Sequence, residues 1–127
     1  MSSESFRVEP LDATFGAVVT NVKLAELTNL TFAKLYDTWL KNALLVFPAQ
    51  HLSNGEQIAF AKCFGELEFE LTALSNIRDD GSVRTSDDDD MVKILKGNMG
   101  WHTDSTYMPV QAKGAFFYRA RGAVKGW

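Results

Sequence analysis

The spacing of apolar residues in the first part of the chain predicts two short strands, a helix and a buried strand. Apolar residues at 6–8 and 16–20 flank a turn-forming stretch at 10–14, which is typical of two strands joined by a turn. Over 31–42 the apolar positions recur every three or four residues, the period of one helical face. That face comprises Phe32, Leu35, Tyr36, Trp39 and Leu40. The apolar run at 44–47 then predicts a buried strand.

A second helix is expected to begin at Ser53. Ser53 and Glu56 have the spacing of a capping box, in which each side chain satisfies a free backbone N–H at the helix start. Gly65 supplies the C-terminal end of this helix. We expect Cys63 to be a buried and unreactive thiol. The side chains predicted to face the core are Ile58, Ala61 and either Cys63 or Phe64.

The second half of the chain predicts more strands, separated by polar segments. Strict alternation over 66–71 predicts a half-buried strand, and apolar runs predict strands at 91–95 and 115–118. The segment 78–90 is polar and is expected to be a solvated loop. Its four aspartates at 87–90 lack the ligand spacing of a calcium-binding EF-hand. This order of helices and strands favours a mixed α+β chain.

Composition and charge narrow the class of protein. With 46% hydrophobic and 23% charged residues among 127, the chain is neither a disordered tail nor a coiled coil. No apolar run approaches the roughly 20 residues that a membrane span needs, and no secretory signal is expected. A net charge of -3 provides no basic footprint for nucleic acid. One cysteine suits a reducing compartment, so a cytoplasmic protein is expected.

The last residues, from Val124 to Trp127, follow an apolar run without a closing helix or polar tail. We therefore expect residues 1–127 to be the N-terminal portion of one larger domain, apparently truncated. A sheet cut in this way would leave an open edge.

His102 and Asp104 are the candidate site. In extended backbone, side chains two positions apart point to the same face, so an imidazole nitrogen and a carboxylate oxygen would meet at one point. These groups are two thirds of a 2-His-1-carboxylate triad, which binds Fe(II) and leaves positions open. Two alternatives stay open: a loop histidine hydrogen-bonded to a nearby carboxylate, and a zinc hydrolase that uses the same pair.

The residues around this pair resemble a known enzyme family. The stretch 98–107, Asn-Met-Gly-Trp-His-Thr-Asp-Ser-Thr-Tyr, is similar to the motif of the taurine dioxygenase / 2,4-dichlorophenoxyacetate dioxygenase family. Leu-Leu-Val-Phe at 44–47 and Phe-Gly-Glu-Leu at 64–67 match the family in order and spacing. The resemblance implies an Fe(II)- and 2-oxoglutarate-dependent dioxygenase. It also implies the N-terminal part of a double-stranded β-helix, a jelly-roll or cupin-like fold, with flanking helices.

The resemblance assigns roles to four residues. His102 and Asp104 match the first two iron ligands, Asn98 matches a position that contacts substrate, and Trp101 matches an aromatic residue beside the metal. The family's third histidine ligand and the arginine that pairs with 2-oxoglutarate have no match within residues 1–127. His51, the other histidine, matches a surface loop.

The resemblance implies hydroxylation of a small organic substrate, with 2-oxoglutarate and O2 consumed and succinate and CO2 released. Where the taurine enzyme holds its substrate with a His and a Tyr, this chain has Glu70 and Ala73. The carboxylate of Glu70 would repel a sulfonate. We therefore favour an aryloxyalkanoate over an alkylsulfonate or a sulfate ester.

Two further expectations come from the same resemblance. The segment 87–90 matches a variable loop near the family's active-site mouth, which makes a lid one interpretation. Two protein ligands should hold iron only weakly. The alternative function is thus a catalytically incomplete fragment with a structural or self-associating role, and a homo-oligomer stays open.

Overall fold

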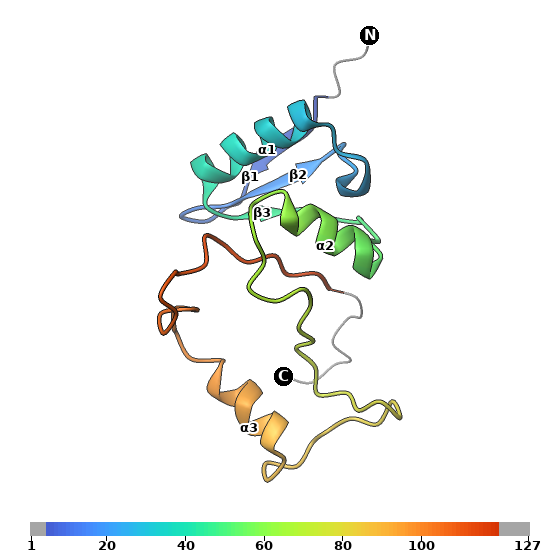
Figure 1. The fold of residues 1–127 in the computed structure, drawn as a ribbon, viewed down its shortest axis with the longest axis vertical. Coiled ribbons are helices and arrows are strands. Elements are labelled where there is room, and N and C mark those ends of the chain that lie inside the picture. The colour runs from blue at the N-terminus through green and yellow to red at the C-terminus, as the bar shows by residue number, and fades with distance from the viewer. Residues whose placement is uncertain (1–4, 120–127) are drawn as a thin grey trace. The chain divides into compact units, whose positions relative to one another are not determined.

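The computed structural model describes residues 5–119, and its contacts divide the chain into two units. The first unit is Met1–Leu67 with Phe117–Trp127, and the second is Glu68–Phe116. The described residues contain both helices and a sheet, so the predicted mixed α+β class is confirmed (Figure 1). Within 5–119, no helix has the length and apolar character needed to cross a membrane.

The sheet of the first unit has three strands in the order β1-β2-β3. β1 (Arg7–Pro10) pairs antiparallel with β2 (Ala17–Thr20), and β2 pairs in parallel with β3 (Leu45–Val46). Ala17 and Val19 on the central strand are fully buried, as the two-residue period of a strand with one face on a core requires. These strands lie where the predictions at 6–8, 16–20 and 44–47 placed them, though β3 is shorter. The prediction that the strand at 44–47 is buried is wrong, because Leu44 and Val46 are 45% and 42% exposed.

A short 3-10 helix, η1 (Leu24–Glu26), connects the sheet to the first long helix and lies against α2 (Asn54–Lys62). The Gln50 side chain holds η1 in place. Its Oε1 accepts from the Leu24 N–H at 2.9 Å, and its Nε2 donates to the Val22 carbonyl at 3.1 Å. One amide thus satisfies two backbone groups that no regular ladder reaches.

Helix α1 (Asn29–Asn42) matches the helix predicted over 31–42. Thr28 caps its start, and Leu35 on its inner face is 1% exposed. The prediction that Leu40 shares this face is wrong, because Leu40 is 64% exposed. Leu40 lies five residues beyond Leu35 and therefore about 140° around the helix, on the edge that faces solvent.

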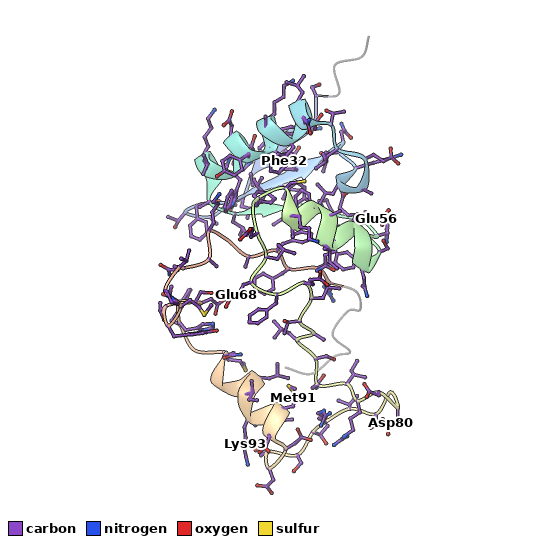
Figure 2. The ribbon with its side chains drawn as sticks, in the orientation of Figure 1. Phe32, Glu56, Glu68, Asp80, Met91 and Lys93 are labelled. Carbon is purple, nitrogen blue, oxygen red and sulfur yellow. The ribbon has the colours of Figure 1, made fainter. Side chains whose placement is uncertain are left out.

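An aromatic cluster joins α1 to the end of α2. Phe64 packs against Phe32, Tyr36 and Trp39 of α1, with ring centroids 5.0, 5.9 and 5.3 Å apart. Phe60 packs on the same Phe64 ring at 5.4 Å. Phe32, labelled in Figure 2, points from α1 into this cluster. Tilted and edge-on ring pairs at these distances stabilise a core beyond the area that they bury.

The capping box that begins α2 is confirmed. The Ser53 N–H donates to Glu56 Oε2 at 2.7 Å, and the Glu56 N–H donates to Ser53 Oγ at 3.3 Å. Hydrogen bonds from Ser53 to the Glu56 carboxylate, above all the one from the Ser53 backbone N–H, lower the pKa of Glu56. The prediction of a buried Cys63 is wrong: Cys63 is the exposed C-cap, and its Sγ donates to the Ala59 carbonyl. The Phe64 ring fills the core position instead.

The second unit departs from its predicted strands. Residues 90–97 form helix α3 (Asp90–Gly97), where a strand over 91–95 and a loop through 90 were expected. Asp89 caps this helix, with Oδ1 accepting from the Met91 N–H at 3.0 Å. Val92 is buried, and Met91 and Leu95 are half-buried at helical spacing. A short apolar run is compatible with either a helix or a strand. Here the N-cap at Asp89 favours the helix.

The predicted strands at 66–71 and 115–118 do not form either. Both stretches have irregular backbone in the described structure. A strand exists only where a neighbouring strand satisfies its N–H and C=O groups. In the second unit the one described pairing is the single bridge between Ile77 and Val83. Alternation alone was therefore not sufficient to make a strand.

Replacement of Leu35 by Ala is expected to lower the free energy of unfolding by about 2–5 kcal/mol, because it empties a fully buried site. Urea unfolding followed by near-UV circular dichroism reports the loss of the aromatic cluster. Leu40→Ala is the matched control, the same truncation at an exposed position of α1. It should change the free energy by no more than about 0.5 kcal/mol. Equal losses in the two variants would show that α1 packs through a different face.

Candidate metal site

The segment that carries the candidate site follows directly after α3. Asn98 is the C-cap of α3, and its N–H donates to the Ile94 carbonyl at 3.0 Å. His102 and Thr103 have irregular backbone, and Asp104 begins a turn. Because the helix end fixes where the segment starts, α3 is the element that places the two candidate ligands within the second unit.

The side chains of His102 and Asp104 meet. His102 Nε2 lies 3.2 Å from Asp104 Oδ1, and the two side chains are 48% and 68% exposed. Their exposure means that a cation could reach the pair from solvent without displacing core residues. The distance is also that of a hydrogen bond or ion pair. It therefore equally suits the alternative of a loop histidine that is bonded to a nearby carboxylate and binds no metal.

A backbone carbonyl holds the opposite edge of the imidazole. His102 Nδ1 lies 2.7 Å from the Gly100 carbonyl oxygen. A carbonyl only accepts, so this contact assigns the proton to Nδ1. In neutral histidine, Nε2 then carries the lone pair and faces the carboxylate. Metal-binding histidines use this arrangement, in which the second nitrogen donates to a carbonyl or carboxylate and fixes the ring.

The spacing of the two atoms fits a metal ion. Ligands on adjacent corners of an octahedron, each with a bond of about 2.1 Å, are about 3 Å apart. His102 Nε2 and Asp104 Oδ1, at 3.2 Å, satisfy that spacing. Within residues 5–119, no group of three or more His, Cys, Asp or Glu side chains comes together as a metal site. The described residues therefore bring together two candidate ligands, His102 and Asp104.

The other predicted site residues are all exposed. Trp101 points fully into solvent, and Asn98 is exposed at the end of α3. Glu70 and Ala73 are exposed in irregular backbone. His51 belongs to the first unit, where it is exposed in the loop before α2. The roles of Asn98 and Trp101 toward substrate stay predictions.

One functional feature of this unit was missed by sequence reasoning. Asp89 Oδ2 accepts from Arg84 at 3.1 Å and from Arg78 at 3.3 Å, while its Oδ1 caps α3. Partial desolvation raises the pKa of Asp89, but the bonds from Arg84 and the Met91 N–H outweigh it and lower the pKa. Two further ion pairs involve α3: Lys93 pairs with Asp90, and Lys96 pairs with Asp87. The sequence signal that could have predicted this helix start was Asp89, a common N-cap residue type just before the apolar run that begins at Met91.

Comparison with known families agrees with the motif. The family model described as taurine catabolism dioxygenase TauD, TfdA family matches residues 7–126. The chain therefore belongs to the TauD/TfdA family of dioxygenases. The matched residues include the two α-helices of the first unit, helix α3 and the segment with His102 and Asp104.

Three relatives within this family are similar to the chain in sequence. Over 116 residues the chain is 66% identical to the (S)-phenoxypropionate/alpha-ketoglutarate-dioxygenase of Sphingobium herbicidovorans, covering 91% of this chain and 40% of that protein. It is 51% identical to the enzyme of the same name from Delftia acidovorans, covering 89% and 41%. It is 32% identical to the alpha-ketoglutarate-dependent 2,4-dichlorophenoxyacetate dioxygenase of Cupriavidus pinatubonensis, covering 82% and 42%.

A solved structure is similar as well. The crystal structure of AAD-2 in complex with Mn(II) and N-oxalylglycine superposes with a TM-score of 0.77 at 30% identity. The match covers 85% of this chain and 39% of that one. The chain thus spans about two fifths of the length of the relatives that it matches.

Acid is expected to loosen the start of α3. The pKa of Asp89 is below its ordinary 3.8, so the stability that its carboxylate contributes is complete above that value. It is lost as the pH falls through the lowered folded-state pKa. Carbon-13 chemical shifts of residues 91–95 measure the helix across this range.

Asp89→Asn is the control for this titration. Asparagine is also a good N-cap but carries no carboxylate, so its α3 should lack the part of the acid transition that Asp89 causes. The same loss of helix in both proteins would mean that other carboxylates cause it.

Proposed function

We propose that this chain supplies two of the iron ligands, His102 and Asp104, of an Fe(II)- and 2-oxoglutarate-dependent dioxygenase. The observation that carries the proposal is the 3.2 Å approach of Nε2 to Oδ1, with Nδ1 held by Gly100. Membership of the TauD/TfdA family and relatives named as alpha-ketoglutarate-dependent dioxygenases support it. The likeness to AAD-2, whose crystal structure is in complex with Mn(II) and N-oxalylglycine, supports a metal-dependent function.

Each residue has a distinct task in this proposal. The Gly100 carbonyl keeps the proton on Nδ1, so that the Nε2 lone pair of His102 is free to bind a cation. Asp104 adds a negative charge and an oxygen ligand beside it. Fe(II), when bound, supplies the activation of O2 with 2-oxoglutarate as co-substrate, which yields succinate and CO2. This chain would fill two positions, and the family's third histidine, which has no match in residues 1–127, would fill another. The positions then left open would take 2-oxoglutarate and O2.

The substrate class proposed is an aryloxyalkanoate, with a 2-aryloxypropionate as the first candidate. The two relatives named for (S)-phenoxypropionate are 66% and 51% identical to this chain. The presence of Glu70 and Ala73, where the taurine enzyme has a His and a Tyr that hold its substrate, agrees with that choice. The double-stranded β-helix is proposed for the complete domain, on the basis of the AAD-2 likeness.

The chain by itself is expected to bind Mn(II), a probe for Fe(II), only weakly, because it offers two protein ligands. Water-proton relaxation during a Mn(II) titration measures this affinity. His102→Ala should weaken the binding at least about tenfold. His51→Ala, which removes the other histidine, should leave it unchanged. Tight stoichiometric binding of Fe(II) and 2-oxoglutarate by the unmodified chain would contradict the two-ligand site.

Activity is best tested in a chimaera in which this chain replaces the matched segment of the Sphingobium relative. We expect succinate release coupled to O2 uptake with (S)-2-phenoxypropionate and none with taurine. His102→Ala and Asp104→Ala should each lower the turnover at least about a hundredfold, since changes outside the ligand shell alone cost about 10–100-fold.

His51→Ala in the same chimaera is the control and should keep its activity. A folded chimaera without turnover would instead favour the alternative function, an incomplete fragment that self-associates. The large apolar side chains that the second unit exposes, among them Trp101, Tyr107 and Val110, are the observation behind that alternative.

A further inference from the structure

Ser105, the residue after Asp104, differs from everything around it. It is 6% exposed, whereas residues 98–104 and 106–110 are all exposed. Its φ is 59°, in the left-handed region that residues with a side chain seldom adopt. Such a conformation persists only where surrounding contacts fix it, and it is concentrated at functional sites.

Two hydrogen bonds fix Ser105. Its Oγ–H donates to Glu68 Oε2 at 3.0 Å, a contact between residues 37 positions apart in the sequence. The Met108 N–H donates to the Ser105 carbonyl at 3.1 Å and closes the turn that follows. Glu68, labelled in Figure 2, is thus the link between this turn and the start of the second unit. A hydrogen bond to a carboxylate is stronger than one between neutral groups.

We propose that Glu68 and Ser105 are positioning residues for the metal site. Their bond fixes the backbone directly after Asp104, and the Gly100 carbonyl fixes the ring of His102 before it. The side chain of Asp104 is 68% exposed, so in this proposal its place beside His102 depends on these two anchors more than on burial. The inference rests on the proposed metal role of the pair. Residues that orient ligands in this way affect metal affinity without touching the metal.

Four variants of the chain separate positioning from simple stability. Ser105→Ala and Glu68→Ala remove the bond from either side, and a double variant removes both groups. Glu68→Gln keeps an oxygen that can accept from Ser105 and should restore the wild-type behaviour. Ser75→Ala is the control, since it removes another hydroxyl of the same unit, one that accepts from the Ile77 N–H.

The first readout needs no metal. Three-bond NMR couplings report the χ1 angle of Asp104, and nitrogen-15 shifts report the ring of His102. In Ser105→Ala and Glu68→Ala we expect the couplings of Asp104 to average over rotamers. In Glu68→Gln and Ser75→Ala they should equal those of the wild type.

The second readout is the affinity for Mn(II) alone. Ser105→Ala and Glu68→Ala should each weaken it by about tenfold. The double variant should be no weaker than either single one, because all three lack the same bond. Additive losses would contradict a shared interaction, and wild-type couplings with wild-type affinity in both single variants would overturn the inference.

The two proposals can fail separately. If His102→Ala does not change the Mn(II) affinity of the wild-type chain, the metal role fails. The couplings of Asp104 then still decide whether Glu68 and Ser105 position it.

Discussion

The approach of His102 Nε2 to Asp104 Oδ1 is the contact on which every functional statement about this chain depends. Two exposed polar groups do not keep such a distance by themselves, because water competes for both and each side chain gains entropy by rotating away. Hydrogen bonds lie on either side of the pair: the His102 ring meets the Gly100 carbonyl, and the Ser105 hydroxyl donates to the Glu68 carboxylate. In the proposed account these bonds, and not burial of the two side chains, hold the pair together.

Features set by neighbouring residues were predicted well from the sequence. The capping box of Ser53 and Glu56 and the helix over 31–42 depend on spacings of three or four residues, which one helix satisfies by itself. The approach of His102 to Asp104 was also expected from their spacing, while their role as metal ligands stays a prediction. Family membership, inferred from the motif at 98–107, was confirmed by the match over residues 7–126.

Features that depend on distant partners could not be predicted. The segments 66–71 and 115–118 have the alternation of strands but no described neighbour to pair with. Helix α3 formed where a strand was expected, because Asp89 is held by two arginines as well as by the helix start. The bond from Ser105 to Glu68 joins residues that no local pattern connects. In each case the outcome depends on whether a partner elsewhere in the chain is present, which the local pattern does not reveal.

Anomalous X-ray diffraction from crystals of this chain grown with Mn(II) tests the central claim most directly. The account predicts a manganese peak about 2 Å from both His102 Nε2 and Asp104 Oδ1, with Nδ1 still donating to the Gly100 carbonyl. Crystals that hold manganese elsewhere while His102 and Asp104 remain in direct contact would contradict it. In that event the pair would be a loop ion pair of the second unit and nothing more.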